Sequence, residues 1–278
     1  SPTPTRRAPP LKEEDLPPTA GDISQCSVKY TSVYTYTGKA ITPAVAVSLN
    51  GKNLIKGTDY TVEYLNNTDI GTAIILIKGT GGYTGTLSRS FVITGPSVKA
   101  PSGFTNTNSS PTVVRLDWNK VSGVSGYKLQ KWNSQKKVWE TYKIFSADTV
   151  RHNQGGLREG TTLKYRIQSY KRIGNRTFYS TWSEIYASTD PGKVTDLRAV
   201  SVSESGYTIK WSAVRNADKY IVYRYDAASD SYKKLKTVTG TSLKITDRAA
   251  GQRNAYKVQA VKVRSWKTYE GQLVKMKF

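Results

Sequence analysis

Leu116-Asp117-Trp118 recurs later in the chain as Ile209-Lys210-Trp211. Gly126-Tyr127-Lys128-Leu129 recurs at the same spacing as Lys219-Tyr220-Ile221-Val222. The common spacing is 93 residues. A fixed spacing between two sets of apolar and aromatic anchors indicates an internal duplication.

The duplication extends further along the chain. Tyr165-Arg166-Ile167-Gln168-Ser169 corresponds to Tyr256-Lys257-Val258-Gln259-Ala260 at a spacing of 91, so one copy has a two-residue deletion. We therefore predict two copies of one domain of about ninety residues. Their boundaries fall at Gly95-Pro96 to Pro101 and at Asp190-Pro191-Gly192.

The residues before the duplication also have the pattern of strands. Val45, Val47 and Leu49 alternate with small residues, and the run Ala73 to Ile77 is continuous, as in a strand covered on both faces. Turn residues such as Asn50-Gly51 separate these stretches. Period-two alternation with closely spaced turns predicts an all-β fold of consecutive β-sandwich modules.

The duplicated region resembles tandem fibronectin type III domains. The resemblance rests on Trp118 and Trp211, on Tyr127 and Tyr220, and on the Leu157, Gly160 and Tyr165 corner. It implies that each tryptophan fills the space between two sheets and that the corner tyrosine bonds to nearby backbone. The second copy has Ala250 near the place of the corner leucine.

Residues 24–95 resemble a different module. Tyr36-Thr37-Gly38-Lys39-Ala40-Ile41-Thr42-Pro43, Gly57-Thr58-Asp59-Tyr60 and Gly79-Thr80-Gly81-Gly82-Tyr83-Thr84-Gly85 are similar to an immunoglobulin-like repeat of Gram-positive surface proteins. This resemblance implies an exported, cell-surface protein with a non-catalytic role. The predicted order is a Pro-rich tether (1–23), the immunoglobulin-like module (24–95) and two fibronectin type III-like modules (98–190 and 191–278).

Charge is distributed unevenly over these four segments. The chain carries a formal net charge of +22, and the last two modules contribute +9 and +11 of it. Such a field attracts polyanions in a salt-dependent manner. Glycans, anionic cell-wall polymers and neighbouring modules or proteins are the partners that we consider. Nucleic acid ranks below them because the basic residues are spread over many strands and no recognition helix or zinc finger is visible.

Catalytic patterns are weak. His152 is the single histidine, aligns with Ile245 of the second copy and is expected to be structural. Cys26 is the single cysteine, which excludes an intramolecular disulfide and favours an inert thiol. Gly79 to Gly85 resembles a phosphate loop, but a strand rather than a helix is expected to follow it. We predict no enzyme, no cofactor, no metal, no membrane insertion and a monomer.

Ligand binding is an alternative to a spacer role. If Tyr165 and Ile167 point inward, then Arg166, Gln168 and Tyr170 point outward, next to Trp132 on the neighbouring strand. Aromatic rings with amides and guanidinium groups suit sugars and carboxylates, but the same residues are also typical of a solvated sheet face or a module contact.

Three further aromatic residues bear on this alternative. Trp139 and Trp182 are expected to pack structurally, whereas Trp266 and Tyr269 belong to the loop between the last two strands, where recognition residues gather. The sequence thus predicts a spacer, adhesion or interaction segment. The alternative is a module that binds carbohydrate or an anionic cell-wall polymer and is accessory to an enzyme outside this chain.

Overall fold

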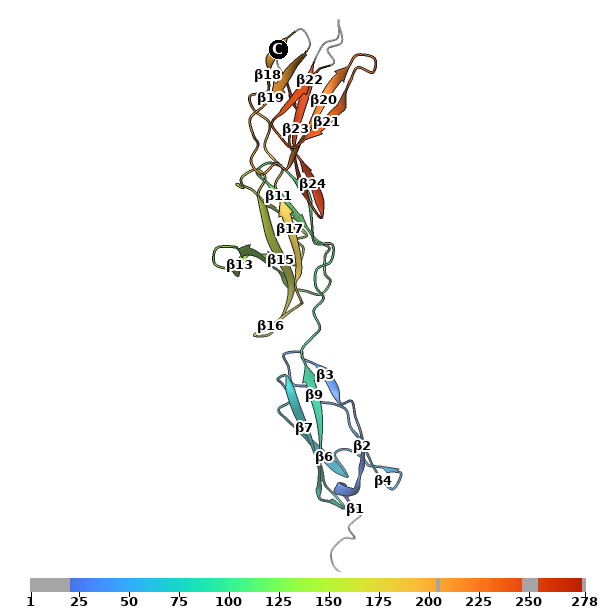
Figure 1. Cartoon of the computed structure of the whole chain (residues 1–278). Coiled ribbons are helices and arrows are strands. Elements are labelled where there is room, and N and C mark those ends of the chain that lie inside the picture. Colours follow the sequence, from blue (N-terminus) through green and yellow to red (C-terminus); the bar gives the residue numbers. More distant parts are fainter. Residues whose placement is uncertain (1–20, 204–205, 247–254, 277–278) are drawn as a thin grey trace, which may run out of the picture. The chain divides into compact units, whose positions relative to one another are not determined.

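The chain is all-β, as predicted. The computed structural model describes residues 21–203, 206–246 and 255–276. Apart from a 3₁₀ turn at Ile23–Gln25, every regular element in these ranges is a strand (Figure 1). Most of the predicted tether and the Ala250-Gly251 pair lie outside the described residues. Within them, we find no helix with the length and apolarity needed to span a bilayer.

The first sandwich contains β1 to β9. The strands are β1 (Gly21–Asp22), β2 (Ser27–Lys29), β3 (Val33–Thr35), β4 (Ala46–Leu49), β5 (Lys52–Asn53), β6 (Tyr60–Leu65), β7 (Gly71–Gly79), β8 (Tyr83–Thr84) and β9 (Thr86–Thr94). They form a four-stranded sheet β3-β9-β7-β6, a three-stranded sheet β2-β4-β5 and the short parallel pair β1-β8. Strands β8 and β9 follow Gly79 at the place where a phosphate loop would need a helix.

Strand β7 corrects one expectation. Ala73, Ile75 and Ile77 are fully buried, but Ile74 and Leu76 on the other face are only half-buried. The continuous apolar run is therefore covered on one face by the core and only in part on the other.

The second and third sandwiches have the same strand order. The second contains β10 (Thr105–Ser109), β11 (Val114–Asp117), β12 (Gly126–Asn133), β13 (Val138–Ser146), β14 (Arg151–Gln154), β15 (Thr162–Ile173), β16 (Arg176–Tyr179) and β17 (Ser183–Ser188). The third contains β18 (Arg198–Ser203), β19 (Gly206–Lys210), β20 (Lys219–Asp226), β21 (Ser231–Val238), β22 (Ser242–Ile245), β23 (Tyr256–Arg264), β24 (Lys267–Glu270) and β25 (Val274–Lys275). Sheet β10-β11-β14 corresponds to β18-β19-β22, and β13-β12-β15-β16 corresponds to β21-β20-β23-β24. A three-stranded sheet facing a larger one is the arrangement that the fibronectin type III resemblance implies.

The core anchors repeat as well. Trp118 and Tyr127 pack edge to face at 5.7 Å between ring centroids, and Trp211 and Tyr220 do so at 5.4 Å. Each tyrosine hydroxyl accepts a hydrogen bond of 2.8 Å from a backbone N–H six residues earlier. The duplication therefore preserves this polar contact of the core as well as the aromatic one.

The corner tyrosine departs from the expectation. Tyr165 Oη donates to the side chain of Gln154, with 2.5 Å between Oη and Oε1, rather than to backbone. The hydroxyl is buried, and in this copy a glutamine on β14 lies within its reach.

The structural alignment of His152 also differs. His152 pairs with Leu116, and the residue that pairs with Ile209 is Leu243, not Ile245. The two-residue deletion therefore precedes β22. His152 is half-buried, and its ring centroid lies 5.2 Å from that of Phe145.

The described chain forms three hydrophobic cores but two compact units. Unit 1 comprises the chain up to Ser97 with Arg172–Phe178, and unit 2 comprises Val98–Lys171 and Tyr179–Phe278. The second and third cores thus belong to one unit. The predicted module boundaries stay a prediction.

Candidate functional site

The candidate ligand residues of the second sandwich lie on one face. Gln130 of β12 pairs with Arg166 of β15, and Gly126 pairs with Tyr170. Because Tyr165 and Ile167 are fully buried in the core, the side chains of Arg166, Tyr170 and Gln130 lie on the other side of the sheet. The predicted orientation of the two strands is confirmed.

Most of these side chains contact one another rather than solvent. The Arg166 guanidinium lies 4.4 Å from the ring centroid of Trp139 and 4.2 Å from that of Trp182. Its Nε donates to Gln130 Oε1 at 2.7 Å. Gln168 is 6% exposed and Tyr170 is 8% exposed. Arg166, Gln168 and Tyr170 therefore support the face from within and offer little surface to a ligand.

Trp132 lies at the end of the same face. Its ring meets Trp139 edge to face at 5.4 Å, and it is partly exposed. The third sandwich repeats the pair as Tyr225 and Tyr232, with Lys257 Nζ 4.1 Å from the Tyr232 ring centroid. The edge packing predicted for Trp139 is present in both copies.

A row of side chains continues from Trp132 across the sheet. Lys164 Nζ lies 5.1 Å from the Trp139 ring centroid and 5.7 Å from that of Tyr186. Tyr186 in turn stacks on Trp266, with 5.2 Å between centroids and 24° between planes. We call Trp132, Trp139, Lys164, Tyr186 and Trp266 the aromatic strip.

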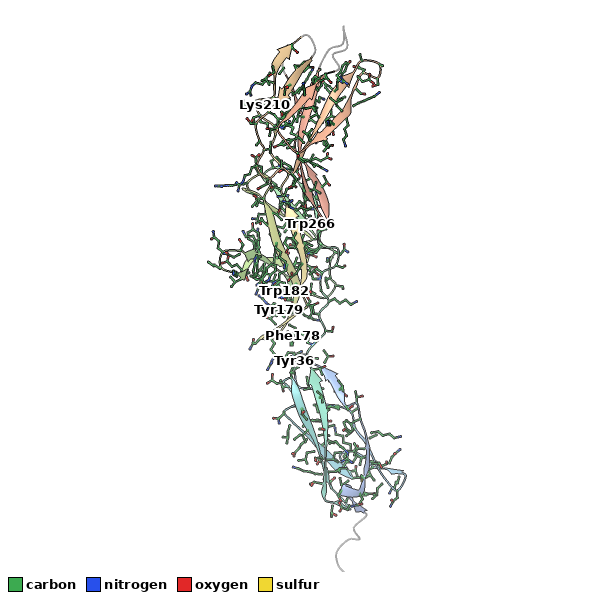
Figure 2. All side chains as sticks on the ribbon, in the orientation of Figure 1. Tyr36, Phe178, Tyr179, Trp182, Lys210 and Trp266 are labelled. Carbon is green, nitrogen blue, oxygen red and sulfur yellow. The ribbon has the colours of Figure 1, made fainter. Side chains whose placement is uncertain are left out.

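Trp266 lies at the other end of this strip, in the turn between β23 and β24, as predicted (Figure 2). It is 45% exposed, and its stacking partner Tyr186 is 49% exposed. Its Nε1 donates to Tyr269 Oη at 3.1 Å, and Tyr269 Oη donates to Asn106 Oδ1 at 3.2 Å. Tyr269 differs from the prediction, because it belongs to strand β24 rather than to the loop and is 1% exposed. It therefore supports Trp266 through this hydrogen bond and offers no surface to a ligand.

A groove of about 370 Å³ opens beside Trp266, between the second and third sandwiches. Its lining residues are Thr105, Asn106, Glu184, Ile185, Tyr186, Trp266, Lys267 and Tyr269. Three aromatic rings line it, together with the carboxylate of Glu184 and the ammonium group of Lys267. Such a mixture suits a sugar ring, which has both apolar faces and hydroxyl groups.

Tyr186 and Lys164 were not identified from the sequence. Tyr186 is an outward residue of β17, which alternates exposed Glu184 and Tyr186 with half-buried Ile185. The alternation could have identified its orientation. Its partner Trp266 comes from the third sandwich, and no local pattern predicts that contact.

A buried lysine joins the same two sandwiches. Lys262 is 1% exposed, and its Nζ donates to the Gly160 carbonyl, which also accepts from Asn216 Nδ2 at 3.1 Å. Burial lowers the pKa of Lys262, and the nearby Arg264 adds to the effect. Gly160 has φ of +61°, and a Cβ there would lie 2.8 Å from the Arg215 carbonyl oxygen. We call Lys262, Gly160 and Asn216, with Tyr269 and Asn106, the joint.

The remaining reactive groups are isolated. Cys26 is buried, and burial together with the nearby Asp22 raises the pKa of its thiol. Burial, aided by Lys143, lowers the pKa of His152. Within residues 21–203, 206–246 and 255–276, we find no group of three or more His, Cys, Asp or Glu side chains that could hold a metal ion.

Comparison with known proteins gives distant similarities. No family model matches the chain. A Kelch domain-containing protein of Saccharolobus solfataricus is 24% identical over 200 residues, which cover 69% of this chain and 26% of that protein. The chain thus spans about a quarter of the length of this relative.

Solved structures with similarity are fibronectin type III proteins. A two-domain segment of chicken tenascin has a TM-score of 0.38 and 20% identity, over 64% of this chain and 98% of that one. Domains FN1–FN3 of chicken CNTN1 have a TM-score of 0.33 and 14% identity, over 92% of this chain and 98% of that one. The strand order and the repeated core contacts of this chain define its fold.

Proposed function

We propose that this chain is a non-catalytic segment of an exported bacterial cell-surface protein, in which it acts as a spacer and interaction module. The observation that supports this most is the joint. Two sandwiches with separate cores are linked by the contact of Lys262 with Gly160 and by that of Tyr269 with Asn106. The reason to expect export is the resemblance of residues 24–95 to surface-protein repeats, which rests on the sequence motifs alone.

A joint of this kind suits a spacer. A buried ammonium group is costly unless its hydrogen bonds are satisfied, so sliding or bending at the joint would expose or unpair Lys262. The second and third sandwiches would therefore keep one orientation and present whatever lies beyond them in a defined direction.

Spin labels on the two sandwiches test the proposal. In a Cys26→Ser background, cysteines replace the exposed Gln135 and Lys236. We expect a narrow distribution of label distances that broadens when Lys262→Ala and Trp266→Ala are combined. A broad distribution in the parent chain would contradict the spacer role.

Glycan binding is a second candidate function, favoured by the groove beside Trp266. Saturable retention on isolated Gram-positive cell wall, mucin or a neutral polysaccharide at physiological salt is the expected result. Trp266→Ala should abolish it, whereas Tyr142→Ala, which removes an exposed ring outside the aromatic strip, should not. Retention that survives Trp266→Ala but disappears at moderate salt would reflect only the net charge of +22.

A further inference from the structure

The outer face of the three-stranded sheet differs in charge between the two copies. In the second sandwich, Asp117 of β11 pairs with Thr105 of β10 and with Arg151 of β14. Arg151 Nε lies 2.6 Å from Asp117 Oδ1, and Arg115 Nε lies 3.0 Å from Oδ2. Thr107 also donates to this carboxylate. The face thus holds an oxyanion between two guanidinium groups.

In the third sandwich, the residue at the place of Asp117 is Lys210. Lys210 of β19, which is labelled in Figure 2, pairs with Arg198 of β18 and with Ser242 of β22. Lys244 pairs with Thr208 one step further along the same face. Arg198, Lys210 and Lys244 are all exposed, since the core residues Ile209 and Leu243 point to the other side.

These three cations have no carboxylate partner within the described part of the chain. Arg198 Nη1 donates to the backbone carbonyl of Asp196 at 3.1 Å, and the Asp196 carboxylate accepts from Ser212 instead. Like charges directly opposite each other on a sheet are destabilising. Arg198 and Lys210 are such a pair, and a bound anion would relieve their repulsion.

We propose that the outer face of β18-β19-β22 binds a linear polymer that carries carboxylate or phosphate groups, whose oxyanions lie against Arg198, Lys210 and Lys244. The site is separate from the groove beside Trp266 and does not depend on the spacer role. Neighbouring strands are about 4.8 Å apart, so the cations lie at short steps across the face. An isolated anion at such an exposed site is screened by salt, whereas a polymer engages several cations at once.

Two charge reversals of equal size test the proposal. Lys210→Asp installs the residue of the second sandwich, and Lys234→Asp makes the same change at an exposed position of β21, in the other sheet. The probes are poly(glycerol phosphate) and polygalacturonate, with a neutral polysaccharide as the blank. In physiological salt, we expect Lys210→Asp to weaken binding by about tenfold and Lys234→Asp by much less.

The outcomes separate the sources of the anion. A loss with both polymers supports recognition of any regularly spaced oxyanion, and a loss with one of them identifies phosphate or carboxylate as the preferred group. Equal weakening by Lys210→Asp and Lys234→Asp would overturn the site and leave only the net charge. Binding of a DNA duplex that is at least as tight and depends equally on Lys210 would overturn the assignment to such a polymer.

A measurement without ligand guards against loss of the fold. Because Asp117 occupies the corresponding place in the second sandwich, Lys210→Asp should fold and should melt at or above the temperature of the parent chain in low salt. A lower melting temperature would show that Arg198 and Lys210 do not repel each other, which contradicts the basis of the proposal.

Discussion

The buried hydroxyl of the corner tyrosine is satisfied differently in the two copies. Tyr165 donates to Gln154 in the second sandwich, whereas Tyr256 accepts from Tyr207 at 2.8 Å in the third. The strand registers place Gln154 opposite Val114 and Ile245 opposite Tyr207. In each copy, one residue of this cross-strand pair is the polar partner of the hydroxyl, and the residue opposite that partner is apolar.

This exchange predicts a rescue. Gln154→Ile alone leaves the Tyr165 hydroxyl unpaired and should lower the free energy of unfolding by about 1–3 kcal/mol. Adding Val114→Tyr recreates the pair of the third sandwich and should restore part of that loss, as measured by urea unfolding. A double variant that is no more stable than the sum of the single changes would show that the two pairs are not interchangeable.

Asp117 predicts a dependence on pH. Partial burial opposes its ionisation, but hydrogen bonds from Thr107, Arg115 and Arg151 outweigh burial and lower the pKa of Asp117 to about 2. Because the folded-state pKa is below the unfolded value, the stabilisation is present above about pH 4 and is lost as the pH falls toward 2.

Urea unfolding at pH 5 and pH 2 measures this contribution. Asp117→Asn should weaken the second sandwich at pH 5 and change its stability little at pH 2. Equal destabilisation at the two pH values would mean that the Asp117 charge contributes nothing.

At the scale of elements, the face of β12 and β15 is a packed layer of cations on aromatic rings. The planar guanidinium group of Arg166 lies within 4.4 Å of two indole ring centroids, whereas the corresponding Lys257 contacts the Tyr232 ring. A guanidinium group can stack on both of its faces, but an ammonium group cannot.

Arg166→Lys should therefore cost about 1 kcal/mol of stability, since stacking on one ring and the hydrogen bond to Gln130 are lost. Lys257→Arg in the third sandwich is the matched change and should be neutral or slightly stabilising. Thermal unfolding of both variants in low and in high salt distinguishes a loss of stacking from a loss of surface charge interactions. A cost for Arg166→Lys that vanishes in high salt would indicate an exposed charge effect rather than stacking.

At the scale of the molecule, unit 2 depends on the joint at Gly160. Gly160→Ala places a Cβ close to the Arg215 carbonyl and forces alanine to φ of +61°. Gly123 has φ of +71°, but a Cβ there meets nothing within 4 Å. The two changes share the backbone penalty of about 1 kcal/mol and differ in the clash.

We expect Gly160→Ala to uncouple the unfolding of the second and third sandwiches, so that calorimetry resolves two transitions where the parent chain has a more cooperative one. Gly123→Ala should lower the stability of the second sandwich without changing the coupling. If both variants change the coupling alike, the joint does not depend on the close approach at Gly160.

The repeat of Trp118 and Trp211 and the alternation along each strand predict the all-β fold and the inward residues, because burial of a sheet face imposes a period of two on the sequence itself. The orientation of Arg166 and Trp132 follows from the same period. Gln168 and Tyr170 were predicted to contact a ligand, but both are buried. Alternation along a strand gives the direction of a side chain but does not show what covers it.

The sequence alone thus determined the duplication, the class of fold, the outward face of β12 and β15 and the turn that holds Trp266. The tertiary structure alone decided that Trp266 stacks on Tyr186, that Lys262 is buried against Gly160 and that Arg198 lies directly opposite Lys210. Each of these contacts joins residues distant in sequence, and their energies depend on cross-strand register and on the packing of one sandwich against another, which no local pattern records.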